Sequence, residues 1–466
     1  MTKKLIFTAI VVLIIMAVLF VGCQSYSNSV FSMGDKDAVV ESNGGLVVKQ
    51  GDYIYFVNGY SGYYTTNAKD NWFGNVVKGA IMRVKEGEDL ATAEIIVPKS
   101  VMSAYTDSGF SIYGDFIYYV SPSAEETKSG EVMTDVIQFM RTRLDGQETR
   151  VIFQSDSTSL KYKYTPYGLV YNLDGNIYCK AFNSKHFNAK ENGKIIAENV
   201  TSVYFPVSKT YDRATGETLA DYFFYTKSSE DMYDYSNKLY VANASGTVNK
   251  VIINKFSYTN DPVANPSLAF SIGVVNSILE NDGFTLYYTK TVYVGTSSSG
   301  AVTGLFAYKF DSALTFDKTT EVMVSSSTAT KIFPLGYAGG AIVYDAALMV
   351  FKPNTETQVF SGITSVTVIG VVDNYIYYYD SGNLLYRYKM DGSDNVTAIM
   401  SDSMHTSWLV PEIVGDYIYY FNTNKANYNY RIKLSTFDRI DEESLVKELL
   451  GYMTAADAEA TKEEEN

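Results

Sequence analysis

The chain has 466 residues, of which 46% are hydrophobic and 19% charged, and this composition excludes an intrinsically disordered protein. Two cysteines and two histidines exclude a disulfide scaffold and a Cys- or His-rich metal centre, so we expect neither a metal nor another cofactor. The net charge of −14 argues against a nucleic-acid partner, which requires a basic surface.

The first 22 residues have the three parts of a bacterial signal peptide. Lys3 and Lys4 form a positive start, residues 5–21 are almost wholly apolar, and Gly22 precedes Cys23. The end of this run, Leu-Phe-Val-Gly-Cys, resembles a lipobox, in which the Cys is lipidated and becomes the mature N-terminus. We therefore predict a signal peptide at residues 1–22, a diacyl group such as palmitate on Cys23, and a tether at residues 23–36.

An uncleaved membrane anchor is the alternative interpretation of this start. Both interpretations place the rest of the chain on the outer, extracytoplasmic side of the cell membrane. The membrane is thus the first predicted partner, reached through the N-terminal lipid.

A short aromatic phrase recurs along the body of the chain. It is clearest as Gly-Asp-Tyr-Ile-Tyr-Phe at residues 51–56 and returns from Gly114, Asp373 and Gly415, with weaker copies between them. One anchor per copy gives positions 53, 116, 169, 222, 286, 342, 375 and 417, which are 33 to 64 residues apart. Such spacing is typical of propeller blades with insertions.

A second phrase follows several copies and includes a basic residue. Examples are Phe-Met-Arg-Thr-Arg-Leu-Asp-Gly at 139–146 and Leu-Tyr-Arg-Tyr-Lys-Met-Asp-Gly at 385–392. Its alternation predicts a strand, its Asp-Gly predicts a hairpin turn, and a further β-rich piece makes about four antiparallel strands per unit. Because the aromatic strands are apolar on both faces, both faces need covering, which favours radial blades over an open sandwich.

The aromatic strand, the Leu-Tyr-Arg strand and the Lys-Met-Asp-Gly turn resemble a bacterial family of uncharacterised function. That family is described as similar to the YWTD-type propeller of low-density-lipoprotein-receptor-related proteins. The match is clearest over 374–433, with further copies near Tyr53 and Phe116, whereas 160–370 matches only in strand periodicity. The Trp of the YWTD phrase is absent, and Ile54, Ile376 and Ile418 lie in the comparable strands.

We therefore predict an all-β propeller with seven or eight four-stranded antiparallel blades over residues 37–440. Eight markers are present, but the 33-residue interval is compatible with one divided blade, which would give seven. Residues 37–42 are expected to complete the last blade. Residues 441–466 are expected to form a short helical, partly disordered tail, with Leu445, Leu449 and Met453 on one helical stripe.

No catalytic constellation is visible in the sequence. Asp52, Asp115 and Asp416 recur with the repeat, so we interpret them as residues that form turns or inter-blade hydrogen bonds rather than as catalytic groups. Cys179 lies in an apolar run and is interpreted as a buried small hydrophobe. We accordingly predict no catalytic residues, although a site built from loops of different blades would leave no local motif.

Long loops on a rigid scaffold are the usual place for recognition. The predicted ligand-binding residues are loop tyrosines, namely Tyr60, Tyr63, Tyr64, Tyr233 and Tyr235. The preferred function is a non-enzymatic cell-surface lipoprotein whose propeller binds an extracellular protein or glycan. The alternatives are an extracellular propeller enzyme that acts on glycans and a scaffold for envelope assembly.

Overall fold

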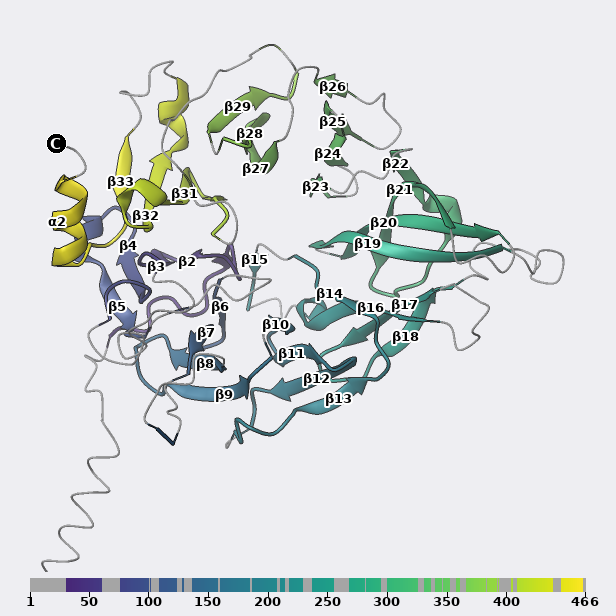
Figure 1. Cartoon of the computed structure of the whole chain (residues 1–466), viewed down its shortest axis with the longest axis horizontal. Coiled ribbons are helices and arrows are strands. Elements are labelled where there is room, and N and C mark those ends of the chain that lie inside the picture. The colour runs from purple at the N-terminus through teal and green to yellow at the C-terminus, as the bar shows by residue number, and fades with distance from the viewer. Residues whose placement is uncertain are drawn as a thin grey trace, which may run out of the picture.

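The computed structural model of the chain is an all-β propeller with eight blades around one axis (Figure 1). It describes residues 31–60, 76–99, 101, 109–123, 128–129, 136–157, 160–184, 187–207, 210–213, 218–228, 237–254, 268–280, 282–294, 300–325, 331–336, 340–345, 347–352, 358–360, 366–382, 384–391, 393, 404, 409–438 and 446–463. The predicted fold class is confirmed, and of the two predicted blade numbers the structure has eight. No helix in the described part is long and apolar enough to cross a membrane.

Blade 1 is a six-stranded sheet, and blades 2 to 4 are four-stranded sheets. From inside to outside, blade 1 is β15 (Thr210–Tyr211), β1 (Val40–Glu41), β2 (Val47–Gln50), β3 (Tyr53–Val57), β4 (Ile81–Lys85) and β5 (Glu94–Val97); blade 2 is β6 (Ser111–Tyr113), β7 (Phe116–Pro122), β8 (Ile137–Arg143) and β9 (Arg150–Ser155); blade 3 is β10 (Lys161–Tyr164), β11 (Gly168–Leu173), β12 (Asn176–Ala181) and β13 (Lys194–Ala197); blade 4 is β14 (Ser202–Tyr204), β16 (Tyr222–Ser228), β17 (Asn237–Asn243) and β18 (Asn249–Ile253).

The last four blades follow in chain order. Blade 5 is β19 (Leu268–Glu280), β20 (Gly283–Val294), β21 (Gly300–Asp311) and β22 (Val322–Ser325); blade 6 is β23 (Lys331–Pro334), β24 (Ala341–Asp345), β25 (Ala347–Phe351) and β26 (Gln358–Phe360); blade 7 has β27 (Thr367–Val372), β28 (Tyr375–Tyr379) and β29 (Leu385–Lys389) among its described residues; blade 8 is β30 (Glu412–Val414), β31 (Tyr417–Asn422), β32 (Tyr428–Lys433) and β33 (Lys447–Leu449).

The helical elements are short. The α-helix of the described part is α2 (Ala455–Glu463), and the 3-10 helices are η2 (Leu90–Thr92), η3 (Thr218–Asp221), η5 (Lys318–Thr320), η6 (Thr423–Lys425) and η7 (Leu434–Asp438).

The ring has two faces that the strand order distinguishes. We count β2 to β5 as the four regular strands of blade 1. Because paired strands are antiparallel, the turn between the first and second strands of each blade lies on one face, which we call the first-turn face. The turns that contain Asp52, Asp115 and Asp416 lie there. Loops between second and third strands leave from the opposite face, which we call the helix face because α2 docks on it.

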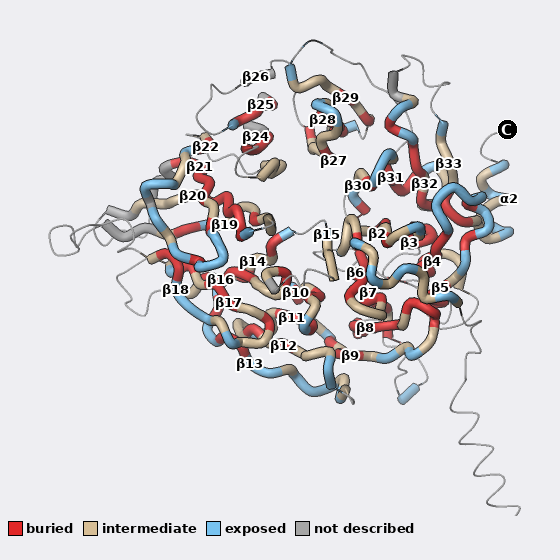
Figure 2. Tube along the Cα trace, turned by 180° about the vertical axis from the view of Figure 1, so that it is seen from behind, coloured by how far each residue is buried: buried red, intermediate tan, exposed pale blue. Residues whose placement is uncertain are grey.

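Aromatic residues fill the space within and between blades. Tyr55, Tyr119, Tyr171, Tyr225 and Tyr420 are each at most 1% exposed. Figure 2 shows the buried residues along the strands inside the ring, with exposed residues mainly at turns and outer strands. The strand tyrosines are therefore core residues, and the predicted covering of both faces of the aromatic strands is confirmed.

The basic residue of the second phrase is buried against the aromatic phrase of the same blade. Each guanidinium lies over the ring of the first aromatic residue of the neighbouring strand, a cation–π contact. The pairs and their distances to the ring centroid are Arg83 over Tyr53 at 4.5 Å, Arg141 over Phe116 at 4.4 Å, Arg387 over Tyr375 at 4.5 Å and Arg431 over Tyr417 at 4.2 Å. The two repeated phrases are thus two halves of one packing unit.

The predicted closure of the ring is wrong. Residues 37–42 contribute β1, which pairs with β2 of blade 1 rather than completing blade 8. The outer strand of blade 8 is β33, whose Leu449 lies opposite Tyr430 of β32. The propeller therefore extends beyond the predicted boundary at residue 440. The helix begins at Ala455 and not on the predicted stripe, because pairing with β32 outweighs the helical spacing of apolar residues.

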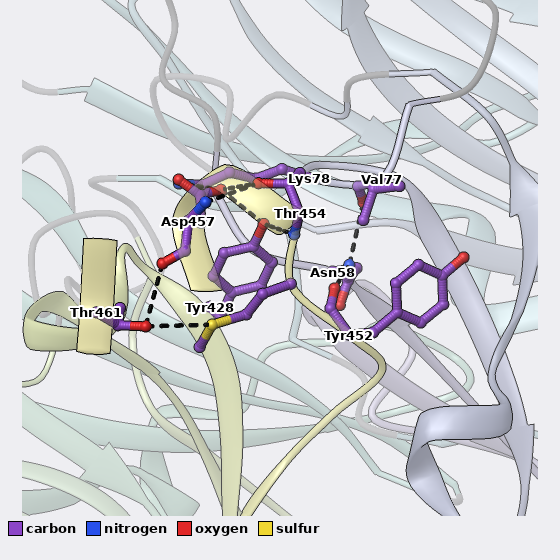
Figure 3. Close-up of polar contacts among 9 residues, drawn as sticks. Asn58, Val77, Lys78, Tyr428, Tyr452, Thr454, Asp457 and Thr461 are labelled. Carbon is purple, nitrogen blue, oxygen red and sulfur yellow. Dashed lines mark hydrogen bonds and ion pairs between the residues drawn. The ribbon is translucent and has the colours of Figure 1, made fainter. Parts of the chain in front are cut away.

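The C-terminal segment is held against blades 8 and 1 by a polar network on the helix face (Figure 3). The hydroxyl of Tyr428 accepts a hydrogen bond from Thr454 N at 3.0 Å and donates one to Asp457 Oδ2 at 2.8 Å. Asn58, buried in blade 1, donates to the carbonyl oxygen of Tyr452 at 2.9 Å. The helix is thereby fixed across the junction between the first and last blades.

Candidate functional site

The loop between the first two strands of blade 4 crosses the centre of the ring. Its described residues are 205–207, 210–213 and 218–221, and we call this loop the strap. Within it, β15 pairs with β1 of blade 1, and Val207 forms a parallel bridge with Ile278 of blade 5. Figure 1 shows β15 near the centre of the ring. The strap therefore links blades that are distant along the chain.

Backbone hydrogen bonds and an ionic cluster hold the strap. Val207 N donates to Ser277 O at 2.8 Å, and Leu279 N donates to Val207 O at 3.1 Å. At its other end, Arg213 lies 3.2 Å from Asp37 and 3.0 Å from Asp115. These contacts give the strap a defined position rather than that of a loose surface loop.

A cavity of about 600 Å³ lies beside the strap in the centre of the ring, and we call it the central cavity. Its walls come from the innermost strands of blades 5 to 8 and from the strap. The lining residues are Val207, Thr210, Asn276, Ile278, Leu279, Ile332, Phe333, Pro334, Leu335, Gly336, Gly370, Val371, Val372 and Ile413.

The described lining of the central cavity is apolar and carries no charge. Thr210 and Asn276 are the polar side chains in its described lining, and none of the described lining residues is ionisable. A Cβ atom on Gly370 would come within 2.8 Å of Ile413 Cδ1, so the glycine makes room for that side chain. The volume and lining are typical of sites for small molecules, and they supply no general acid or base.

Two smaller pockets are built differently. One of about 140 Å³ lies on the other side of the strap, against Phe205 and Pro206. One of about 330 Å³ lies at blade 3, where Lys180 donates to Glu191 O at 2.6 Å and Lys194 donates to Ser245 O at 3.0 Å. Both ammonium groups thus bind backbone carbonyls.

Cys179 lines the blade 3 pocket but is 4% exposed. Burial raises the pKa of its thiol to about 12, so the thiolate that a nucleophile requires is disfavoured at neutral pH. The interpretation of Cys179 as a buried hydrophobe is confirmed.

The repeated aspartates lie in the first turns of their blades, and the carboxylate of Asp115 also pairs with Arg213 of the strap. The backbone oxygens of Asp52, Asp115 and Asp416 accept hydrogen bonds from the residue that follows the third strand of each blade. The donors are Glu86 N at 2.7 Å, Leu144 N at 2.9 Å and Leu434 N at 2.8 Å. Among the residues that the structure describes, no group of three or more His, Cys, Asp or Glu side chains is arranged to bind a metal.

The predicted recognition tyrosines lie only partly within the described structure. Tyr60 is half-buried against the core at blades 1 and 2, and its N–H donates to Asn427 O at 2.9 Å. Tyr63, Tyr64, Tyr233 and Tyr235 lie outside the described residues, as does Cys23.

The predicted recognition tyrosines belong to two loops, one between β3 and β4 and one between β16 and β17. The described residues that flank these loops show where the loops leave the ring. Residues 58–60 and 76–80 follow β3 and precede β4, and Ser228 and Asn237 end β16 and begin β17. Both loops join the second and third strands of their blades, so both leave from the helix face. The sequence analysis predicted the loops but not this shared face.

The strap and the central cavity were missed by the sequence analysis. A visible signal was the length of chain between the Ser-Val-Tyr strand at 202–204 and the aromatic strand from Tyr222, which is longer than a hairpin turn and contains Pro206. The cavity had no sequence signal, because its lining comes from strands of four blades that are apolar throughout.

No protein-family model and no curated protein matches this sequence. Solved structures to which the chain is similar include BamB from Moraxella catarrhalis, with 11% identity over 84% of this chain and 95% of that chain and a TM-score of 0.40. AztD from Citrobacter koseri has 11% identity over 77% and 90%, with a TM-score of 0.36. The C-terminal WD40 domain of Sif2 has 11% identity over 73% and 83%, with a TM-score of 0.35. The propeller assignment itself rests on the eight sheets of this chain.

Proposed function

We propose that the chain is a non-enzymatic binding protein, anchored by a lipid on Cys23 to the outer side of the cell membrane. The observation that carries the proposal is the shared face of the two tyrosine-rich loops, whose flanking residues all lie on the helix face. A rigid ring that presents several adaptable loops on one face suits recognition of a protein or glycan. The N-terminal sequence supports the anchor.

The scaffold gives a reason to prefer binding over catalysis. The repeated arginines stack on aromatic rings, and the central cavity lacks ionisable side chains in its described lining. The repeated arginines are therefore engaged in building the ring. A glycan-cleaving enzyme and an envelope assembly scaffold are the competing functions.

The anchor is tested by mass spectrometry of the protein extracted from membranes. We expect the loss of residues 1–22 and the added mass of a diacyl group on Cys23. Cys23→Ser should abolish both changes, whereas Cys179→Ser, the matched control at the other cysteine, should leave both intact. An unmodified Cys23 on the mature protein would refute the anchor.

Binding is tested with a glycan array and with cross-linking in envelope extracts, followed by alanine variants of the loop tyrosines. Tyr63→Ala, Tyr64→Ala and Tyr233→Ala should each lower the affinity for a captured partner by up to roughly thirtyfold, which is the effect of losing a binding hot spot. Tyr167→Ala, an exposed tyrosine on the opposite face, is the control. Glycan fragments released by the purified protein would instead favour the enzyme.

A further inference from the structure

The second part of the predicted tether, residues 31–36, is not a free linker but is fixed to the first-turn face. Phe31 N donates to Asp145 O at 3.1 Å, in the turn between the third and fourth strands of blade 2. The carbonyl oxygen of Ser32 accepts a 2.7 Å hydrogen bond from Arg83 Nη1. Further along, the Cβ of Asp35 is 3.3 Å from the position that a Cβ would take on Gly51, in the first turn of blade 1.

The remaining tether is short compared with the ring. Eight residue steps separate Cys23 from Phe31, and they reach at most about 29 Å at about 3.6 Å per residue. A folded chain of this length is about 60 Å across, from a radius of gyration of about 23 Å. Given the lipid anchor proposed above, the attachment point on the first-turn face stays within about 29 Å of the bilayer, which favours an orientation with the helix face directed away from it.

The central cavity lies at this same face. Val372 is the last residue of β27 and Leu279 the last but one of β19, and both strands end at their first turn. Leu335 and Gly336 belong to the first turn of blade 6. The strap that forms the remaining wall also starts and ends at the first-turn ends of its strands. The cavity is therefore at the membrane-proximal mouth of the ring.

We infer that the central cavity takes up an uncharged, lipid-like molecule from the membrane to which the chain is anchored. Its described lining offers a large apolar surface, in which Thr210 and Asn276 are the polar side chains. A charged group would enter without an ionic partner among the described lining residues, and such burial is unfavourable. This inference adds a ligand and an orientation to the proposed function and rests on its lipid anchor for the source of the ligand.

The cavity is tested in solution, without any membrane. The chain from residue 23 onward, with Cys23→Ser, is titrated with the neutral fluorophore phenylnaphthylamine, whose emission rises when it leaves water. We expect saturable binding that Ile278→Trp and Ile413→Trp each weaken at least tenfold, since a larger side chain fills the cavity from one of its walls. Met323→Trp, at a half-exposed residue of blade 5, should bind as the parent does.

Two results would overturn the cavity site. One is the absence of saturable binding by the folded parent chain. The other is undiminished binding by both tryptophan variants when their melting curves match that of the control. Stronger binding of a charged analogue of the same fluorophore would contradict the uncharged ligand class.

The orientation is tested with a chemical anchor. Cys23 of the chain from residue 23 onward is coupled to a maleimide lipid in phosphatidylcholine vesicles, and a fluorescent amino acid replaces exposed Asp52 or exposed Glu459. Energy transfer to an acceptor lipid should be clearly greater from position 52, on the first-turn face, than from position 459 in α2. Equal transfer, or greater transfer from position 459, would overturn the orientation. Because the coupling is chemical, this result stands apart from whether cells lipidate Cys23.

Discussion

The carboxylate of Glu412, in β30 of blade 8, accepts a 2.7 Å hydrogen bond from the backbone N–H of Val47, in β2 of blade 1. The two residues are 365 positions apart. The same carboxylate accepts from Leu46 N at 2.8 Å and from Ser42 Oγ at 2.7 Å. One side chain thus joins the two ends of the ring. This is the junction at which residues 37–42 were predicted to complete the last blade.

Removing this carboxylate should destabilise the whole ring. Hydrogen bonds to a charged acceptor contribute about 1.5–3 kcal/mol each, and since three that share one carboxylate are not fully additive, Glu412→Ala should lower the free energy of unfolding by at least about 3 kcal/mol. Glu86→Ala, which removes an exposed ion pair with Lys49, should change it by less than about 1 kcal/mol. Denaturant unfolding followed by circular dichroism provides the comparison. Equal effects of the two variants would show that Glu412 does not close the ring.

Arg83 should control how firmly the N-terminal segment binds the ring. Its guanidinium, 1% exposed, donates to Ser32 O and lies 5.7 Å from the centroid of Phe31. Arg83→Leu should release this segment, so trypsin should cleave after Lys36 at least several times faster than in the parent chain. Arg431→Leu, which removes the equivalent stacked guanidinium from blade 8, is the control. Unchanged cleavage after Lys36 in the folded Arg83 variant would contradict the assignment.

Tyr428 should govern docking of α2. Tyr428→Phe removes the hydrogen bonds with Thr454 N and Asp457 Oδ2, and we expect a loss of about 1–2 kcal/mol of stability and faster proteolysis after Lys462. Tyr178→Phe is the matched control, because the described contact of the Tyr178 side chain is stacking on Tyr171. If the two variants are cleaved after Lys462 at the same rate, the hydroxyl of Tyr428 does not hold the helix.

Lys99 should make stability depend on pH above neutrality. Burial lowers the pKa of its ammonium group to about 7, from 10.5 for an ordinary lysine. Between these values the unfolded chain binds one more proton than the folded chain, so the Lys99 contribution to stability rises with pH by up to about 1.4 kcal/mol per unit. Below pH 7 both states are protonated and the contribution is constant.

The measurement compares the parent chain with Lys99→Met from pH 6 to pH 10. We expect the parent to gain stability relative to the variant above pH 7, while the loss of the 2.9 Å bond from Lys99 Nζ to Gln138 Oε1 shifts all values by a constant amount. Lys85→Met, at an exposed lysine, should show no such slope. A pH-independent difference between the parent and Lys99→Met would mean that Lys99 stays charged when buried.

The blade architecture was predictable because its signals are local. The alternation of aromatic and apolar residues from Tyr53 to Phe56 and the glycine at residue 51, with φ of 55°, specify a hairpin without reference to the rest of the chain. The expected roles of Asp52 and Cys179 followed from the same local patterns. The Arg83 strand was recognised as a repeat, but its stacking on Tyr53 required the register of two strands.

By itself the sequence determined the all-β class, the repeated unit and the identity of the core aromatics, because strand periodicity and turn chemistry act over a few residues. Only the tertiary structure decided the pairing of β33 with β32, the path of the strap across the ring and the central cavity. Each of these depends on contacts between residues far apart in the chain, such as Val207 with Ile278 and Val47 with Glu412. Such contacts arise when eight similar blades close into a circle, and the chain carries no local pattern that distinguishes their partners beforehand.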